Sequence, residues 1–235
     1  MRTRLFILVA LLTAAASPAT AETRNFGINS FEKIRIDGPF KVTLTTGVAP
    51  FAKAIGSAEA IDRVALDMHG NLLVVHNNAS SWGGYPGQDA GTVEIQIGTH
   101  DLTSAWLNGS GALSINKVKG LSFDFSVQGS GLGEIASVAV DQLSINVAGS
   151  ANARLSGDAG KATSVIRGLS NLDAAKLNIK DAIITADGAA TVDAAVANSV
   201  KVVAVGPATI RFSGNPACTL QTSGSITVSG CKATQ

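Results

Sequence analysis

Five charged residues recur at regular intervals in the second half of the chain and could do chemistry together. They follow one another 18 to 20 positions apart, as Glu134, Arg154, Asp173, Asp193 and Arg211. If they occupy equivalent places in successive turns of a repeat, they stack about 4.8 Å apart. Asp173 and Asp193 would then form a carboxylate pair of the kind that retaining glycosidases use. We favour the alternative, a solvated charge ladder that keeps a sheet surface soluble, because no aromatic platform for a sugar accompanies it.

The two cysteines of the chain, Cys218 and Cys231, are separated by twelve residues near its C-terminal end. In an oxidising compartment such a pair usually forms a disulfide, which we predict here. A redox or metal site is the alternative, but the three histidines, His69, His76 and His100, are scattered. We therefore predict no metal site and no cofactor.

A glycine-rich segment, residues 80–91, contains Trp82 and Tyr85. Aromatic residues on such a loop are frequent contact residues, so this pair is a candidate binding site. The alternative, which we favour, is that the two rings fold back onto the body of the protein.

An internal repeat must position the five charged residues. Glycine followed by two small or apolar residues recurs every 18 to 20 positions, and the first glycines of the series are Gly109, Gly129, Gly149, Gly168, Gly188, Gly206 and Gly224. Positions two and four before each glycine, and four and six after it, are mostly apolar. Period two within a repeat predicts two short strands with one buried face, which meet at a glycine corner.

A coil of about 20 residues that lacks a helical segment indicates a solenoid. A leucine-rich repeat has a similar length, but it requires a helix or 3₁₀ segment and a regular Asn ladder. We therefore predict an all-β fold, a parallel β-helix with repeated coils over residues 105–230.

Residues 22–104 have a different pattern and are predicted to form a bulkier N-terminal cap together with the first strands. Alternating or apolar strands are expected at 33–36, 41–44, 51–55, 72–76 and 92–97, and one short capped helix is expected at 57–64. Residues 22–235 would then be a single domain.

The first 21 residues predict a secretory signal peptide, because two arginines precede an apolar run and an Ala-x-Ala cleavage site. The apolar run is too short for a membrane anchor, which requires about 20 apolar residues. The net charge of +1 gives no basic footprint for nucleic acid. We therefore expect export to the periplasm, the cell surface or the medium.

The sequence resembles one family in its early strands and its corners. The early residues are Phe31-Glu32-Lys33-Ile34 and the segment 38–44, Gly-Pro-Phe-Lys-Val-Thr-Leu, and the corners are the Gly-Ser-Gly triplets at 109 and 129. A late Phe-Ser-Gly-Asn-Pro at 212–216 adds to them. With these residues the chain is similar to the DUF2807 family, the putative auto-transporter adhesin, head GIN domain. The resemblance implies a right-handed parallel β-helix at the bacterial periplasm or cell surface, with no catalytic motif.

We therefore predict an exported, non-enzymatic binding or structural module, similar to an adhesin, whose partner is a protein or glycan of the cell envelope. An oligomer is possible. The alternative is a carbohydrate-active β-helix enzyme, a glycoside hydrolase or lyase, that uses the outward Asp173 and Asp193.

Overall fold

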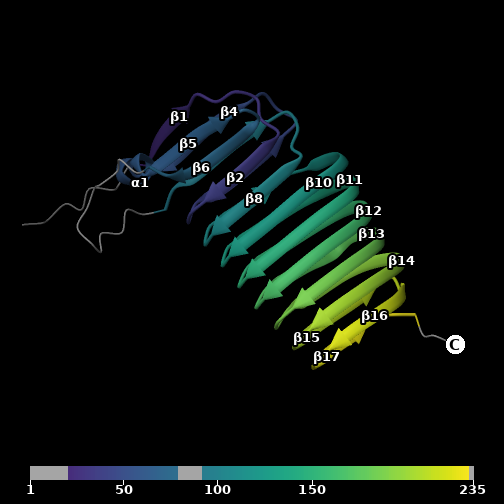
Figure 1. Ribbon diagram of the computed structural model, residues 1–235. Helices are drawn as coiled ribbons and strands as arrows, with labels where there is room; N and C mark the ends of the chain where they lie inside the picture. Colours follow the sequence, from purple (N-terminus) through teal and green to yellow (C-terminus); the bar gives the residue numbers. More distant parts are fainter. Residues whose placement is uncertain (1–20, 79–91, 233–235) are drawn as a thin grey trace, which may run out of the picture.

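The computed structural model describes residues 21–78 and 92–232, which form a β-solenoid of about six turns (Figure 1). All strands of the described residues join in one hydrogen-bonded sheet of 17 strands that winds around the core. The strands of the N-terminal half are β1 (Glu22–Phe26), β2 (Lys33–Asp37), β3 (Lys41–Thr46), β4 (Phe51–Gly56), β5 (Val64–His69), β6 (Leu72–Asn77), β7 (Glu94–Thr99), β8 (Ser104–Gly109) and β9 (Ala112–Ile115). Those of the C-terminal half are β10 (Val118–Gly129), β11 (Leu132–Gly149), β12 (Asn152–Gly168), β13 (Asn171–Asp187), β14 (Thr191–Val205), β15 (Ala208–Ser213), β16 (Ala217–Ser223) and β17 (Ile226–Ser229).

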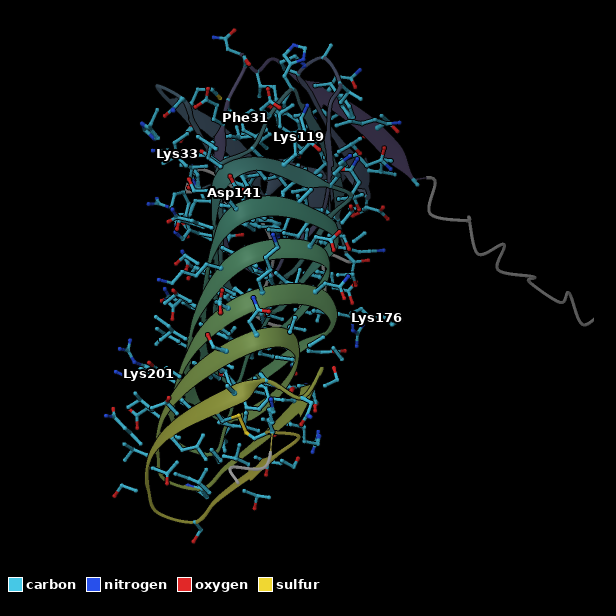
Figure 2. All side chains as sticks on the ribbon, turned by 90° about the vertical axis from the view of Figure 1, so that its right-hand side faces the viewer. Phe31, Lys33, Lys119, Asp141, Lys176 and Lys201 are labelled. Atoms are coloured by element: carbon cyan, nitrogen blue, oxygen red, sulfur yellow. A yellow bond between two sulfur atoms is a disulfide. The ribbon has the colours of Figure 1, made fainter. Side chains whose placement is uncertain are left out.

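Successive coils pair in parallel, and Figure 2 shows them stacked along the molecule with charged side chains such as Lys176 and Lys201 on the outside. The prediction of two short strands per coil is wrong in the middle of the stack. There, each of β11, β12 and β13 runs as a single strand of 17 or 18 residues from one glycine corner toward the next. Each of these strands thus has two arms, one that follows its first glycine corner and one that leads to the next. The bend between the two arms does not end the strand, because it is made by register shifts in the pairing of neighbouring strands, such as the one between Ile135 and Val138.

The core follows the four predicted apolar columns. The two columns before the glycine corner contain fully buried side chains such as Leu107, Val127 and Ile145, and the two columns after it contain Leu113 and Leu155. Each side chain packs on its equivalents in the coils above and below, so the core is a continuous rod rather than a set of separate clusters. A single coil cannot cover its own apolar side chains, and burial therefore requires the whole stack.

The N-terminal strands build further coils of the same solenoid, but out of chain order. Strands β2 and β3 pair in parallel with β8 and β9 on one side and with β6 and β7 on the other. Gly38, between β2 and β3, thus forms another glycine corner, stacked against Gly109. The coil made of β2 and β3 is therefore inserted between two coils that both follow it in the sequence.

The two ends of the stack are built differently. At the N-terminal end, β5 pairs antiparallel with β6, β4 with β7, and β1 with β4. The predicted helix is present as α1 (Ala58–Asp62), capped by the Ser57 side chain, which accepts a hydrogen bond from the backbone N–H of Ala60. At the C-terminal end the predicted disulfide between Cys218 and Cys231 joins β16 to the segment after β17, with a Cα–Cα distance of 5.7 Å.

Candidate binding surface

A stack of glycines fixes the register in which every side chain of the solenoid is presented. Each corner glycine has a positive φ, and its Cα lies against the corner of the preceding coil. A Cβ on Gly129 would lie 2.5 Å from the carbonyl oxygen of Gly109, and one on Gly149 would lie 2.5 Å from that of Gly129. The same carbonyls accept backbone hydrogen bonds from the next corner, with Ser130 N–H to Gly109 O at 2.9 Å. Glycine is therefore required both by the backbone angle and by the close approach.

This register brings the predicted charge ladder together. The ladder runs straight across neighbouring strands on the arm that follows the corner, in the order Thr43, Ser114, Glu134, Arg154, Asp173, Asp193, Arg211 and Ser229. Asp173 and Asp193 are direct neighbours in it, as the repeat spacing indicated. Thr43 extends the ladder into the coil of β3, which the repeat pattern alone did not include.

Every charged residue of the ladder forms an ion pair with a residue of opposite charge. Arg154 contacts two carboxylates, that of Glu134 at 2.6 Å and that of Asp173 at 3.2 Å. Arg211 binds Asp193 with two hydrogen bonds of 2.5 and 2.8 Å, from Nε and Nη2. The hydrogen bond to Asp193 raises the pKa of the Arg211 guanidinium. The two aspartates are thus turned to different arginines, and the ladder forms a row of paired charges along the surface.

A shallow groove lies at the N-terminal end of this ladder. Its volume is about 420 Å³, and it lies over Leu44, Ile115 and Ile135, whose side chains are buried in the core beneath it. Its polar lining consists of hydroxyl groups, an amide and two charged groups, namely Thr43, Thr45, Ser114, Asn116, Ser156, Glu134 and Arg154. Hydroxyl, amide and charged groups around such a groove can exchange hydrogen bonds with a polar ligand. We refer to the ladder together with this groove as the ladder face.

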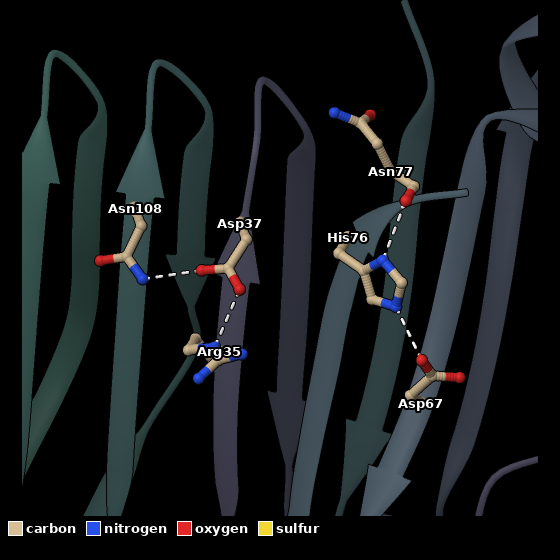
Figure 3. Close-up of polar contacts among 6 residues, drawn as sticks. All are labelled: Arg35, Asp37, Asp67, His76, Asn77 and Asn108. Carbon is tan, nitrogen blue, oxygen red and sulfur yellow. Dashed lines mark hydrogen bonds and ion pairs between the residues drawn. The ribbon is translucent and has the colours of Figure 1, made fainter. Parts of the chain in front are cut away.

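A second polar cluster lies on the other arm, near the N-terminal end of the stack (Figure 3). The imidazole of His76 lies between two acceptors, with Nε2 2.7 Å from a carboxylate oxygen of Asp67 and Nδ1 2.9 Å from the carbonyl of Asn77. The hydrogen bond to Asp67 raises the pKa of His76. One coil further on, Asp37 accepts from Arg35 at 2.8 Å and from Asn108 at 2.7 Å.

The contact of His76 with Asp67 could not be predicted from the repeat, because Asp67 lies on β5, a strand that the sequence pattern did not indicate. The described residues contain no group of three or more His, Cys, Asp or Glu side chains that could hold a metal ion. Trp82, Tyr85 and residues 1–20 of the predicted signal peptide lie outside the described residues. Within the described ranges no helix is long and apolar enough to cross a membrane.

Several solved bacterial structures share this fold. A putative adhesin from Bacteroides fragilis is 19% identical and aligns with a TM-score of 0.80 over 89% of this chain and 96% of its own. A putative lipid binding protein from Parabacteroides distasonis is 17% identical, with a TM-score of 0.72 over 90% of this chain and 98% of its own. A putative adhesin from Parabacteroides merdae is 19% identical, with a TM-score of 0.68 over 90% of this chain and 96% of its own.

Among the curated proteins, none matches this sequence. The family model of the putative auto-transporter adhesin, head GIN domain, matches residues 30–216, from just before β2 to just before β16. This range includes the two N-terminal coils, all but the last of the stacked corner glycines and the whole charged part of the ladder. The chain belongs to the DUF2807 family of putative auto-transporter adhesin head GIN domains.

Proposed function

We propose that this protein is an exported, non-enzymatic module that binds a protein or glycan of the cell envelope through its ladder face. Membership in a family described as adhesin domains is the observation that carries this proposal. The predicted signal peptide and the disulfide support export, because disulfides persist in oxidising compartments. The periplasm and the cell surface both fit this assignment.

The ladder face suits a binding role because it is ordered before a partner arrives. Its outward side chains are spaced by the strand separation, and the glycine stack fixes the backbone that carries them, so little backbone ordering remains to be done on binding. Arg154 also has further N–H groups beyond those that contact Glu134 and Asp173, and these can donate to a ligand in the adjacent groove.

The same geometry favours binding over glycosidase chemistry at Asp173 and Asp193. A retaining glycosidase requires one carboxyl group that donates a proton and a second that is free to attack the sugar. Here Asp173 accepts from Arg154, and both oxygens of Asp193 accept from Arg211. The pair is engaged in ion pairs rather than directed at a common reaction centre.

The test is a binding screen with the exported chain, residues 22–235, on a glycan array and on envelope extract. Arg154→Glu reverses the charge beside the groove, and we expect it to weaken binding at least tenfold. The matched control is Lys161→Glu, a charge reversal at an exposed position on the other arm. If both variants lose binding equally, or if neither variant loses binding, the ladder face is not the binding surface.

Two further measurements separate the alternatives. Fractionation of expressing cells should place the mature chain outside the cytoplasm, and a cytoplasmic chain that retains residues 1–21 would contradict export. Incubation with a panel of polysaccharides should release no product. Turnover that is lost in Asp173→Asn would instead establish the carbohydrate-active enzyme.

A further inference from the structure

The last coil of the solenoid leaves an edge open at the C-terminal end of the molecule (Figure 1). Among the described residues, β16 pairs with β14 only. Leu220 belongs to an inward column whose equivalents, Ile184 and Val202, are 1% and 0% exposed, yet Leu220 itself is 47% exposed. An apolar side chain in a core position is thus open because no coil of the described residues covers it.

This edge lacks the charges with which proteins usually protect an open strand. No charged residue occurs between 212 and 231, a stretch that includes all of β16 and β17. The closing strands at the opposite end are protected, since β1 carries Glu22 and Arg24 and β5 carries Asp67. Two identical uncharged edges bring no like charges together when they meet. The C-terminal end is therefore better suited to pairing with its own copy than the charged N-terminal end is.

The free part of the edge has a defined length. At its start, the backbone N–H of Lys232 donates to the carbonyl of Pro216 at 2.9 Å, and this segment covers the beginning of β16. At its other end the chain turns at Gly224, which has a φ of +117°. The segment Thr219–Ser223 remains between these two limits.

We propose that two copies of this protein associate end to end through antiparallel pairing of β16 with its equivalent. Facing residues of an antiparallel pair lie on the same side of the sheet. A two-fold axis at Gln221 satisfies this condition, because it places Gln221 opposite its own copy and Leu220 opposite Thr222. The exposed Leu220 of each copy is then covered, and the pairing stays clear of both Lys232 and the corner at Gly224.

The test introduces a charge at the two-fold axis, in place of the neutral Gln221. Gln221→Glu keeps the side-chain shape and places two carboxylates opposite each other, whereas Gln221→Arg places two guanidinium groups there. We expect the unmodified chain to reach twice the monomer mass in light scattering and to go no further as its concentration rises. Each variant alone should dimerise about fivefold or more weakly, since facing like charges oppose pairing.

Mixing the two variants should restore the dimer, because each carboxylate then faces a guanidinium group; a folding defect would not be rescued in this way. Gln142→Glu, the same change at an exposed position on an inner strand of the same arm, should leave the dimer unchanged. A chain that stays monomeric at all concentrations, a mass that grows beyond two copies, or a dimer that Gln221 variants do not weaken would each overturn the proposal.

Discussion

The glycine stack makes a sharp prediction, because the chain contains two exposed glycines with the same backbone angle and different surroundings. Gly168 and Gly47 both have a φ of +81°. A Cβ on Gly47 would meet nothing within 4 Å, whereas one on Gly168 would lie 2.5 Å from the carbonyl oxygen of Gly149. Alanine at both positions therefore shares the conformational cost, and only alanine at 168 adds a collision with the neighbouring coil.

The magnitude of each change follows from these contacts. The left-handed backbone costs an L-residue roughly 1–2 kcal/mol, and the smaller entropy of the unfolded chain offsets part of this, which leaves about 1 kcal/mol for Gly47→Ala. In Gly168→Ala the carbonyl of Gly149 must move away, although it accepts the backbone N–H of Leu169 at 2.8 Å. Loss of that hydrogen bond and of packing around it adds about 2 kcal/mol.

The assay is unfolding in urea, followed by circular dichroism, with a thermal scan as a second measurement. We expect Gly168→Ala to lower the free energy of unfolding by about 3 kcal/mol and Gly47→Ala by about 1 kcal/mol. The difference of about 2 kcal/mol corresponds to a gap of roughly 4–8 °C in melting temperature for a domain of this size. Equal effects within about 0.5 kcal/mol would refute the idea that the close approach of the corners, and not the backbone angle alone, requires glycine.

Three other results are expected. Replacing Cys218 and Cys231 with Ser should cost about 3 kcal/mol in the chain-entropy account and lower the melting temperature by several degrees; unchanged melting, or two free thiols in exported material, would show that packing alone holds the last coil. Because the pKa of His76 is raised in the folded chain, its stabilising effect should be complete below pH ~6.5 and disappear as the pH rises through the folded value. The pH dependence of melting should therefore weaken in His76→Gln, and an NMR titration of His76 in the folded chain that gives a pKa at or below ~6.5 would contradict it. Arg154→Ala should change stability by no more than about 1 kcal/mol, since exposed ion pairs contribute little; a larger loss in urea unfolding would mean that the ladder holds the coils together.

The parts of the fold that repeat could be predicted from the sequence, because an interval of 18 to 20 residues makes each coil comparable with the next. The apolar columns, the glycine corners and the neighbourhood of Asp173 and Asp193 all follow from that interval. The continuous strands did not, since the bend between the arms is made by shifts of register that leave no sequence signal.

The N-terminal coils escaped the repeat analysis for a different reason. Gly38 and Gly109 stack as neighbours in space, but 71 positions separate them in the sequence, so no regular interval relates them. The antiparallel strand β5 has a mixed burial pattern and was not indicated, which also hid the contact between Asp67 and His76. Ladder residues could thus be aligned from the sequence, whereas a polar contact between non-repeating strands required the structure.

The insertion of β2 and β3 between later coils has a consequence for how the chain folds as it is made. Neighbouring coils such as β11 and β12 close loops of about 20 residues, whereas β2 must wait for β6 and then for β8, which pair with it 39 and 71 positions later. Longer closures are slower and entropically less favourable. Strands β2 and β3 therefore lack one of their two parallel neighbours until β8 and β9 have been synthesised, so this coil is paired on both sides only once the chain extends through Ile115. The folding nucleus is expected in the regular middle coils, to which the N-terminal strands add last.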